Sequence, residues 1–305
     1  MLARVSRVMT RVCPRPILRF IRDCVARVSG RLIADPRRVQ RALSRPPTAF
    51  WERRIMDVMS CPDNQTIPRV LDAGRVRDGW IVMHNGLLVG GLSYYGQGML
   101  HMLVRNRGVH EPQEELAFME ILPSVAKGSA MLEMGGYWAF YSLWFKTVVP
   151  EARTYVVEPM PLHLVAGMRN FERAGQTSVF ARAYVGDPKR TSDDGTPVIT
   201  VDDFCKQHGL TQLAILHADI QGAELEMLRG ARSMFASQRI DFVFVSTHSD
   251  KLHASCLQWL KEQEYDIVAS ADLQETYSYD GLIVAKSPAA VGPSSICISK
   301  KRSLC

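Results

Sequence analysis

The chain has 305 residues, of which 47% are hydrophobic and 22% charged, and its formal net charge is +6. These values are those of an ordinary globular protein able to bury a sizeable core, and they exclude a wholly disordered chain. No uninterrupted run of about 18 apolar residues occurs, so no membrane span is predicted.

The positive charge is concentrated in residues 1–48, which we interpret as a basic extension. Eleven arginines and two aspartates within the first 41 residues give that segment +9, so the remainder sums to −3. Apolar residues recur there at helical spacing beside arginines: Leu2, Val5, Val8, Met9 and Val12. Such a helix can rest peripherally on an anionic membrane surface. It also resembles an organellar transit peptide, and the plainest interpretation is a solvated extension.

Residues 49–110 follow, and for them a small subdomain with a β-hairpin is predicted. Two apolar runs flank Asn85-Gly86, and Asn-Gly between apolar runs is a strong hairpin signal. The hairpin is either part of a lid over a pocket or an edge extension of a larger sheet. Pro112 then starts a helix that leads into the main domain, residues 111–286.

The segment 131–159 carries the clearest functional pattern. An apolar run ends in Glu133 and turns through Gly135 and Gly136, and after a helical stretch a second apolar run ends in Glu158-Pro159. In an open α/β sheet, ligands bind beyond the carboxyl ends of the strands, where this turn and this acid meet. A bare glycine turn lets a ligand approach the backbone, and the acid can accept both hydroxyls of a ribose. The pattern predicts a nucleoside site.

Two ring side chains indicate which nucleoside cofactor is favoured. A dinucleotide site uses G-x-G-x-x-G, so that a pyrophosphate can sit on the helix N-terminus. Counting from Gly135, Tyr137 and Phe140 occupy the second and third glycine positions and would fill that space. S-adenosylmethionine has a ribose but no phosphate, and its cationic groups favour acids such as Glu133. The pattern therefore favours S-adenosylmethionine over NAD.

Strands and helices continue to alternate after Glu158, which predicts an α/β fold with a mostly parallel sheet. In chain order we expect a helix around 164–171, a strand 179–185, a polar loop 187–197, a helix from 201, a strand 213–219, a helix 223–229, a strand 242–245 and closing strands at 265–268 and 281–284. The tail, residues 287–305, is expected to be loose.

Residues 200–231, TVDDFCKQHGLTQLAILHADIQGAELEMLRGA, closely resemble the signature of the FkbM-type S-adenosylmethionine-dependent methyltransferases. The glycine turn and Glu158-Pro159 fall where that family has its cofactor motifs, and the resemblance spans about residues 111–286. It implies a Rossmann-like class I methyltransferase fold, with helices on both faces of the sheet. It also implies O-methylation, often of hydroxyls on sugars or secondary metabolites. We therefore expect cofactor contacts from Glu133, Gly135, Gly136, Tyr137, Glu158 and Pro159.

Four positions depart from the family pattern. Ala139 stands at the usual second glycine and is small enough to be tolerated, and His217 stands where lysine is frequent. Gln221 replaces the usual glutamate, so any role of that acid does not carry over. Tyr137 replaces a small polar residue, and it either narrows the pocket, stacks on the cofactor or packs into the core.

Methyl transfer to a hydroxyl needs a group that takes the proton, and a histidine near neutral pKa suits this role. His248 ends the fifth predicted strand and is the first candidate for the general base. His217 shares a strand face with Asp219, so either could reach the same pocket, and His253 ranks third. Asp219 either contacts the cofactor or acceptor or stabilises the next helix. For each histidine a purely structural role is the competing interpretation.

Asp219, Glu224 and His248 could form a divalent metal site, but their spacing does not demand one, and no metal is predicted. Glu224 is interpreted as a helix-stabilising acid. Asp280 is interpreted as a turn residue that could also approach the acceptor. Seven scattered cysteines without a C-x-x-C pair suit a reducing compartment. The sequence thus predicts a cytoplasmic S-adenosylmethionine-dependent O-methyltransferase with a small-molecule or glycan acceptor. No basic groups surround the site, so no nucleic-acid partner is predicted. An NAD-linked oxidoreductase and a non-catalytic binding module on the same fold are the alternatives.

Overall fold

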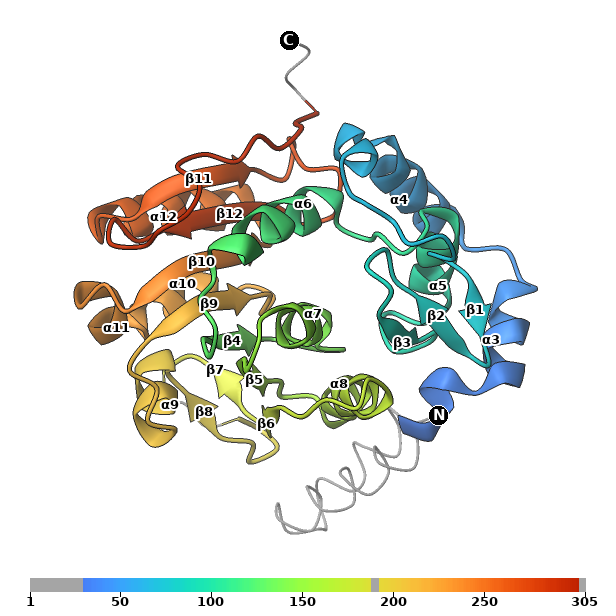
Figure 1. Cartoon of the computed structure of the whole chain (residues 1–305), viewed down its shortest axis with the longest axis horizontal. Helices are drawn as coiled ribbons and strands as arrows, with labels where there is room; N and C mark the ends of the chain where they lie inside the picture. Colours follow the sequence, from blue (N-terminus) through green and yellow to red (C-terminus); the bar gives the residue numbers. More distant parts are fainter. Residues whose placement is uncertain (1–29, 188–191, 302–305) are drawn as a thin grey trace.

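A seven-stranded sheet forms the centre of the molecule (Figure 1). The computed structural model describes residues 30–187 and 192–301. The strands are β4 (Ala130–Met134), β5 (Arg153–Val157), β6 (Val179–Ala181), β9 (Leu213–Ala218), β10 (Ile240–Thr247), β11 (Asp266–Ala271) and β12 (Gly281–Lys286). Their spatial order is β11-β12-β10-β9-β4-β5-β6. Neighbours from β6 to β10 pair in parallel, whereas β12 runs antiparallel to both β10 and β11. This is the Rossmann-like arrangement of class I methyltransferases, and the predicted fold class is confirmed.

The order of the strands reverses between β4 and β9. From β4 the chain builds outwards through β5 to β6, and from β9 it builds in the other direction through β10. Open α/β sheets bind ligands beyond the carboxyl ends of the strands at such a reversal. The predicted glycine turn follows β4 and Asp219 follows β9. The topology therefore brings both features to one place at the edge of the sheet.

Helices cover both faces of the sheet (Figure 1). One face carries α6 (Pro112–Ile121), followed by the 3-10 turn η3 (Leu122–Ser124), α7 (Phe140–Val148) and α8 (Pro161–Arg173). The other carries α9 (Val201–Gln207), α10 (Glu224–Arg229), α11 (Arg232–Ala236) and α12 (Asp250–Glu262). Met131 and Ile215 join the core beneath α6 and α7, whereas Leu132 and Leu216 join the core beneath α9 to α12. Strands buried on both faces read as continuous apolar runs, which is why the pattern was visible in the sequence.

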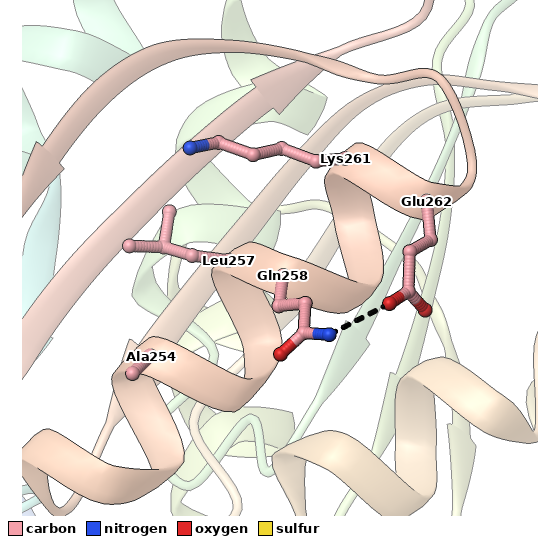
Figure 2. Close-up of a pocket in the computed structure, with 5 residues that line it drawn as sticks. All are labelled: Ala254, Leu257, Gln258, Lys261 and Glu262. Atoms are coloured by element: carbon pink, nitrogen blue, oxygen red, sulfur yellow. Dashed lines mark hydrogen bonds between the residues drawn. The ribbon is translucent and has the colours of Figure 1, made fainter.

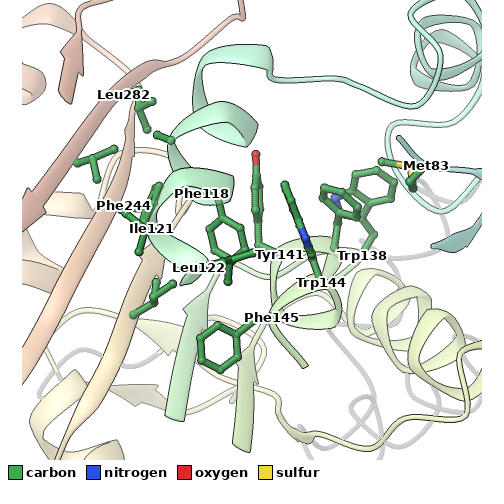
Figure 3. Packing of buried hydrophobic residues seen from close by; sticks show 14 of the residues in the cluster. Met83, Phe118, Ile121, Leu122, Trp138, Tyr141, Trp144, Phe145, Phe244 and Leu282 are labelled. Atoms are coloured by element: carbon green, nitrogen blue, oxygen red, sulfur yellow. The ribbon is translucent and has the colours of Figure 1, made fainter. Parts of the chain in front are cut away.

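The core beneath α6 and α7 is rich in aromatic rings (Figure 3). The ring of Phe118 lies 5.1 Å from those of Tyr141 and Trp144 and 5.5 Å from that of Phe244 on β10. The same core continues through Met83, which is fully buried, into the N-terminal part of the chain. Residues 49–110 therefore share the hydrophobic core of the sheet.

The N-terminal unit contains the predicted hairpin within a small separate sheet. Its elements are η1 (Arg31–Ala34), α3 (Pro36–Leu43), α4 (Ala49–Ser60), η2 (Pro62–Gln65), β1 (Val76–Arg77), β2 (Trp80–Val82), β3 (Leu88–Gly90) and α5 (Gln97–Arg105). β2 and β3 pair antiparallel across Asn85-Gly86, which confirms the hairpin. This sheet has the order β1-β2-β3 and is not continuous with the central sheet, so the edge-extension alternative is wrong. Instead, the amide of Gly90 donates to Asn170 on α8 at 2.9 Å.

The predicted third strand, 179–185, is broken into two pieces. β6 ends at Ala181, and β7 (Tyr184–Val185) pairs in parallel with β8 (Val198–Ile199) in a separate two-stranded sheet. Arg182 lies at the break, where its Nε donates to the carbonyl of Pro159 at 3.1 Å and its Nη2 contacts Asp194 at 3.0 Å. A buried guanidinium needs such partners, and satisfying them turns the chain out of the sheet.

Both chain-end expectations need correction where the structure describes them. Residues 30–48 are not a free extension, because Val39 on α3 is 1% exposed and the carbonyl of Ile33 accepts from Leu92. Residues 287–301 are not loose, because Ile296 is 5% exposed and its amide donates a hydrogen bond to Val268 on β11. The amide of Ser299 donates a hydrogen bond to the carboxylate of Asp63. The predicted amphipathic helix at 2–12 lies outside the described residues. Within those residues, no helix has both the length and the apolar character to cross a bilayer.

Candidate active site

The turn after β4 is built so closely that only glycine fits its first position. The amides of Gly135 and Gly136 both donate to the carbonyl of Val157, at 2.8 and 3.2 Å. Gly135 has a φ of +77°, and a Cβ there would lie 1.8 Å from the backbone oxygen of Asp219. The ends of β4 and β9 thus touch through bare backbone, which is the close approach that glycine permits.

Two residues after this turn hold a left-handed conformation that side chains seldom adopt. Tyr137 has a φ of 41° and Ala139, the N-cap of α7, a φ of 56°. The resemblance places a second glycine at position 139, and the positive φ explains that preference. Alanine adopts it at a cost of roughly 1–2 kcal/mol. Strained residues that the surrounding structure over-determines are typical of ligand sites.

The conformation of Tyr137 aims its amide at the predicted ribose acid. Glu158 is 4% exposed, and its two carboxylate oxygens accept from the amides of Tyr137 (3.1 Å) and Met160 (2.8 Å). Nδ1 of His163 lies 3.5 Å from the same carboxylate oxygen that accepts from Met160. Each carboxylate oxygen has a further lone pair, so the fixed acid can still accept ribose hydroxyls.

A cavity of about 440 Å³ opens at this point, within the range of small-molecule sites. Gly135, Tyr137, Glu158, Pro159 and Asp219 all line it. Glu133 and Gly136 line a neighbouring cavity of about 20 Å³ together with Gly135, Tyr137 and Asp219. The structure therefore gathers every predicted cofactor residue around two adjoining spaces.

Tyr137 and Phe140 differ in their relation to the cavity. Tyr137 lines it, whereas Phe140 is fully buried in the core beneath the turn. Of the two rings expected to displace a pyrophosphate, only Tyr137 occupies the site. The expectation for Phe140 is corrected, because its side chain points into the packing of α6 and α7.

The mouth of the cavity is crossed by a loop that sequence reasoning missed. Tyr94 and Tyr95, which follow β3, both line the cavity. Nε2 of Gln221 donates to the Tyr95 hydroxyl at 2.9 Å, and the Tyr95 amide donates to the Tyr137 hydroxyl at 3.4 Å. Tyr95 and Gln221 also hold positive φ angles of 42° and 53°. The unit that contains the hairpin thus contributes Tyr94 and Tyr95 to the cofactor cavity. The sequence analysis left a lid role open for the hairpin but did not single out these two tyrosines.

His248, the first candidate base, lies among three carboxylates. Its Nδ1 is 2.6 Å from Glu224, and its Nε2 is 3.3 Å from Asp219 and 3.5 Å from Asp280. Both ring nitrogens face acceptors, so the imidazolium form satisfies both. Burial alone would lower the pKa of His248, but hydrogen bonds to Asp219 and Glu224 outweigh it and raise the pKa to about 10. His248 is therefore a held cation at neutral pH rather than a free base.

Asp280, for which the sequence left open a turn role or an approach to the acceptor, joins this cluster. Burial and the neighbouring charge of Asp219 raise the pKa of Asp280 to about 7, against the opposing effect of His248. Glu224 is fully buried and also accepts from the amide of Gly222 at 2.9 Å, so it fixes both the loop after β9 and His248. Within the described residues, no group of three ligands has the arrangement of a metal site.

His217 and His253 lie deeper in the fold. Nε2 of His217 contacts Glu114 at 2.6 Å, and His217 reaches only the smaller cavity, which Asp219 also lines. His253 contacts Thr247 at 2.8 Å and Ser270 at 3.0 Å, and its pKa is lowered by burial. The alternation argument placed His217 and Asp219 on one face, and both do line that smaller space.

A buried network around the start of α6 was also missed. His110 contacts Glu115 through Nδ1 at 2.6 Å and Glu111 through Nε2 at 3.2 Å, and His84 lies 3.0 Å from Glu115. Burial would lower the pKa of His110, but the charges of Glu111 and Glu115 raise it to about 10. In the sequence these acids read as charges at a helix N-terminus. Their burial depends on a hairpin histidine and on rings from α7.

A second hollow lies on the outer face of α12, away from this edge of the sheet (Figure 2). It is lined by Ala254, Leu257, Gln258, Lys261 and Glu262, with a bond of 2.9 Å from Gln258 to Glu262. All five come from one exposed helix. The hollow offers neither a glycine turn nor a strand-end acid, so the candidate active site is the cavity beside β4 and β9.

Comparisons with known proteins were made at three levels. Residues 150–267 match the family model of the methyltransferase FkbM domain. No curated protein sequence matches the chain significantly. Among solved structures, the chain is similar to TrmK of M. capricolum in complex with S-adenosyl-homocysteine. That match has 12% identity, covers 57% of this chain and 69% of that one, and has a TM-score of 0.40.

Two further solved structures are similar to the chain at comparable levels. The ribosomal protein L11 methylase from Lactobacillus delbrueckii subsp. bulgaricus has 11% identity, 59% and 80% coverage of the two chains, and a TM-score of 0.42. Precorrin-6y C5,15-methyltransferase from Geobacter metallireducens GS-15 has 13% identity, 55% and 87% coverage, and a TM-score of 0.39. One assignment follows from the family match, the strand order and the geometry of the Gly135 turn and Glu158. Residues 150–267 match the methyltransferase FkbM domain, and the chain is an S-adenosylmethionine-dependent methyltransferase.

Proposed function

We propose that this methyltransferase acts on a hydroxyl oxygen of a sugar, a glycan or another small metabolite. The observation that carries the proposal is the carboxyl of Asp280, which shares Nε2 of His248 with Asp219, a residue that lines the cofactor cavity. A hydroxyl must lose its proton when its oxygen is methylated, and a carboxyl whose pKa is about 7 suits that transfer.

The residues around the cavity fit the cofactor. Gly135 lines the cavity with bare backbone, and Glu158 keeps free lone pairs for ribose hydroxyls. Glu133 and Asp219 place carboxyls near the adjoining smaller cavity, where a cationic amino group would be favoured. When bound, S-adenosylmethionine supplies a methyl carbon made electrophilic by its positive sulfur.

The protein's part in the reaction is to hold the acceptor and to take its proton. Bound S-adenosylmethionine would supply the methyl group to the acceptor oxygen and would leave as S-adenosylhomocysteine, with the electron pair of the carbon–sulfur bond. The hydroxyl proton passes to Asp280. His248, held as a cation by Asp219 and Glu224, keeps the carboxylate of Asp280 in place. Correct orientation of reacting groups can supply about 7–11 kcal/mol of the barrier reduction.

The first test is calorimetric titration of the full chain with S-adenosylhomocysteine and, separately, with NADH. We expect saturable binding of S-adenosylhomocysteine, loss of that binding in Glu158→Ala, and retention in Glu172→Ala, which removes an exposed carboxyl from α8. Preference for NADH would contradict the cofactor assignment. Equal binding by both variants would show that Glu158 does not hold the ribose.

The second test identifies the acceptor by mass spectrometry of methylated products from a panel of sugars, glycans and RNA. An O-methyl ether survives mild alkali, whereas a methyl ester does not. A base-stable product from a sugar or glycan supports the proposal, and methylated RNA or a base-labile product opposes it. We also propose a cytoplasmic location, because the described cysteines Cys61, Cys205, Cys256 and Cys297 are all unpaired.

A further inference from the structure

An arginine on α4 stands among aromatic rings at the rim of the candidate active site. Cζ of Arg54 lies 5.1 Å from the ring centroid of Trp51, 5.3 Å from that of Tyr279 and 6.0 Å from that of Tyr95. The ring of Phe50 lies 5.9 Å from those of Trp51 and Tyr279. Three segments distant in sequence thus meet around a single guanidinium.

Arg54 forms no ion pair within 4 Å with any described residue, although its charge lowers the pKa values of Glu111 and Asp280. Its Nε is buried without a hydrogen-bond partner. From the same helix, Glu52 is paired with Arg105 at 2.7 Å, so this helix does contain a satisfied ion pair. A guanidinium carries five donors, and leaving them unpaired near buried surface is costly. Arg54 therefore keeps the donors that a bidentate oxyanion would use.

The two tyrosines around Arg54, Tyr95 and Tyr279, are also close to the residues of the candidate active site. Tyr95 lines the cofactor cavity and bonds Gln221, whereas Tyr279 directly precedes Asp280, the proposed proton acceptor. The positive charge of Arg54 also lowers the pKa values of Tyr95 and Asp280, against the stronger effect of their burial. A molecule whose hydroxyl lies at Asp280 would reach Arg54 with its other end.

The rim is fixed in position yet open to solvent. A Cβ on Gly98 would lie 2.0 Å from the ring of Trp51, so that ring packs directly on the backbone of α5. In contrast, Phe50, Tyr95 and Tyr279 are 46%, 42% and 59% exposed. Large aromatic side chains that are held in place but exposed are typical of binding surfaces.

We propose that Arg54 and its aromatic neighbours bind an oxyanion, a carboxylate or a phosphate, carried by the methyl acceptor. The acceptor is then a hydroxylated compound with an anionic group, such as an acidic or phosphorylated sugar. The aromatic rings cover its apolar face, and the guanidinium pairs with its charge. This inference rests on the proposed function and narrows its acceptor class.

The test compares matched sugars on the protein saturated with S-adenosylhomocysteine. Binding of glucuronate, glucose 6-phosphate and glucose is measured by calorimetry for the wild type, Arg54→Gln and Arg53→Gln. Arg53 is an exposed neighbour on the same helix and serves as the control. We expect at least one charged sugar to bind about tenfold or more tightly than glucose, and Arg54→Gln to abolish that difference. Arg53→Gln should preserve it, and the preferred anion identifies carboxylate or phosphate as the source.

Three outcomes would overturn the inference: neither charged sugar binds, glucose binds equally well, or Arg54→Gln binds the charged sugar as the wild type does. The S-adenosylhomocysteine titration is recorded first for each variant. If it fails in the wild type, the methyltransferase function itself is contradicted. If S-adenosylhomocysteine binds but charged sugars and glucose bind with equal affinity, only the proposed role of Arg54 is contradicted. Thermal unfolding of Arg54→Gln shows whether a weaker affinity reflects a less stable fold.

Discussion

The side chain of Gln221 donates to the hydroxyl of Tyr95 at 2.9 Å, and the two residues are 126 positions apart. One follows β9 and the other follows β3, so this bond joins the N-terminal unit to the end of the central sheet across the cofactor cavity. Both residues hold positive φ angles, which is a further sign that the contact is enforced by the surrounding structure.

Breaking this contact is expected to loosen the cover over the cofactor. In Tyr95→Phe and Gln221→Ala, S-adenosylhomocysteine should dissociate faster, by a factor that corresponds to about 0.5–1.5 kcal/mol for one neutral hydrogen bond. Stopped-flow displacement measures the rate. Gln258→Ala removes a similar bond, to Glu262 on the remote face of α12, and should leave the rate unchanged. Unchanged dissociation in both site variants would show that the loop does not cover the bound cofactor.

Gly135→Ala should abolish cofactor binding and destabilise the fold, because its Cβ would overlap the backbone oxygen of Asp219. Gly128 provides a matched control, since it has the same φ of +77° and a Cβ there would meet nothing within 4 Å. Gly128→Ala isolates the conformational cost of about 1–2 kcal/mol. Urea unfolding should give a clearly larger loss for Gly135→Ala. Equal losses of unfolding free energy in the two variants would mean that the turn after β4 can accommodate a Cβ without a further penalty.

The buried pair of His110 and Glu115 should make stability depend on pH. The pKa of His110 is raised from 6.5 to about 10 in the folded state, so its contribution is complete below pH 6.5 and is lost as pH rises towards 10. Glu115→Gln removes the nearer of the two charge partners of His110, leaving Glu111, and should cost about 3–5 kcal/mol near neutral pH.

Urea unfolding at several pH values between 6.5 and 10 checks this prediction. His248 adds a dependence of the same sign, so the informative quantity is the difference between the wild type and Glu115→Gln. That difference should shrink as pH rises. Glu120→Gln, at an exposed position of the same helix, should follow the wild type at every pH. A difference that stays constant would show that His110 is not the titrating partner.

Asp280→Asn should slow methyl transfer by about 10²–10⁴-fold, the usual effect of losing a positioned proton acceptor. In the wild type, the rate should rise with pH through about 7 as Asp280 loses its proton, and this rise should be absent in the variant. Asp241, near the start of β10, also has a raised pKa and accepts a hydrogen bond from Gln212. Asp241→Asn should therefore leave the pH profile of the rate unchanged. Retention of the rise in Asp280→Asn would assign the proton to another group.

The parts of the site that were predictable lie within continuous stretches of chain. Gly135 and Glu158 follow strands whose apolar runs are visible, and the parallel topology then brings strand ends together. The break at Arg182 was not predictable, because it depends on Asp194 and the carbonyl of Pro159. The conformations of Tyr137 and Ala139 likewise follow from how the turn packs against β5 and β9.

On the acceptor side, the sequence left open an approach by Asp280 and a lid formed by the hairpin, but it did not indicate Arg54 or Tyr95. Arg54, Tyr95 and Asp280 belong to three segments whose meeting depends on how the N-terminal unit docks on the sheet. The buried charges of Glu111 and Glu115 were invisible for the same reason. A local pattern shows that a helix begins with acids, but it cannot show that a hairpin and α7 close over them.

The bonds between Ser299 and Asp63 affect the order in which the protein becomes functional. The amide of Ser299 donates to Asp63 at 3.0 Å across 236 positions, and its carbonyl accepts from Gln113 at 2.6 Å. Asp63 lies just after α4, the helix that carries Arg54. During synthesis, residues 287–301 emerge after all seven strands of the sheet. In a nascent chain, the contact that ties the segment after α4 to residues 287–301 therefore forms after the sheet is synthesised, and contacts of such long range form slowly.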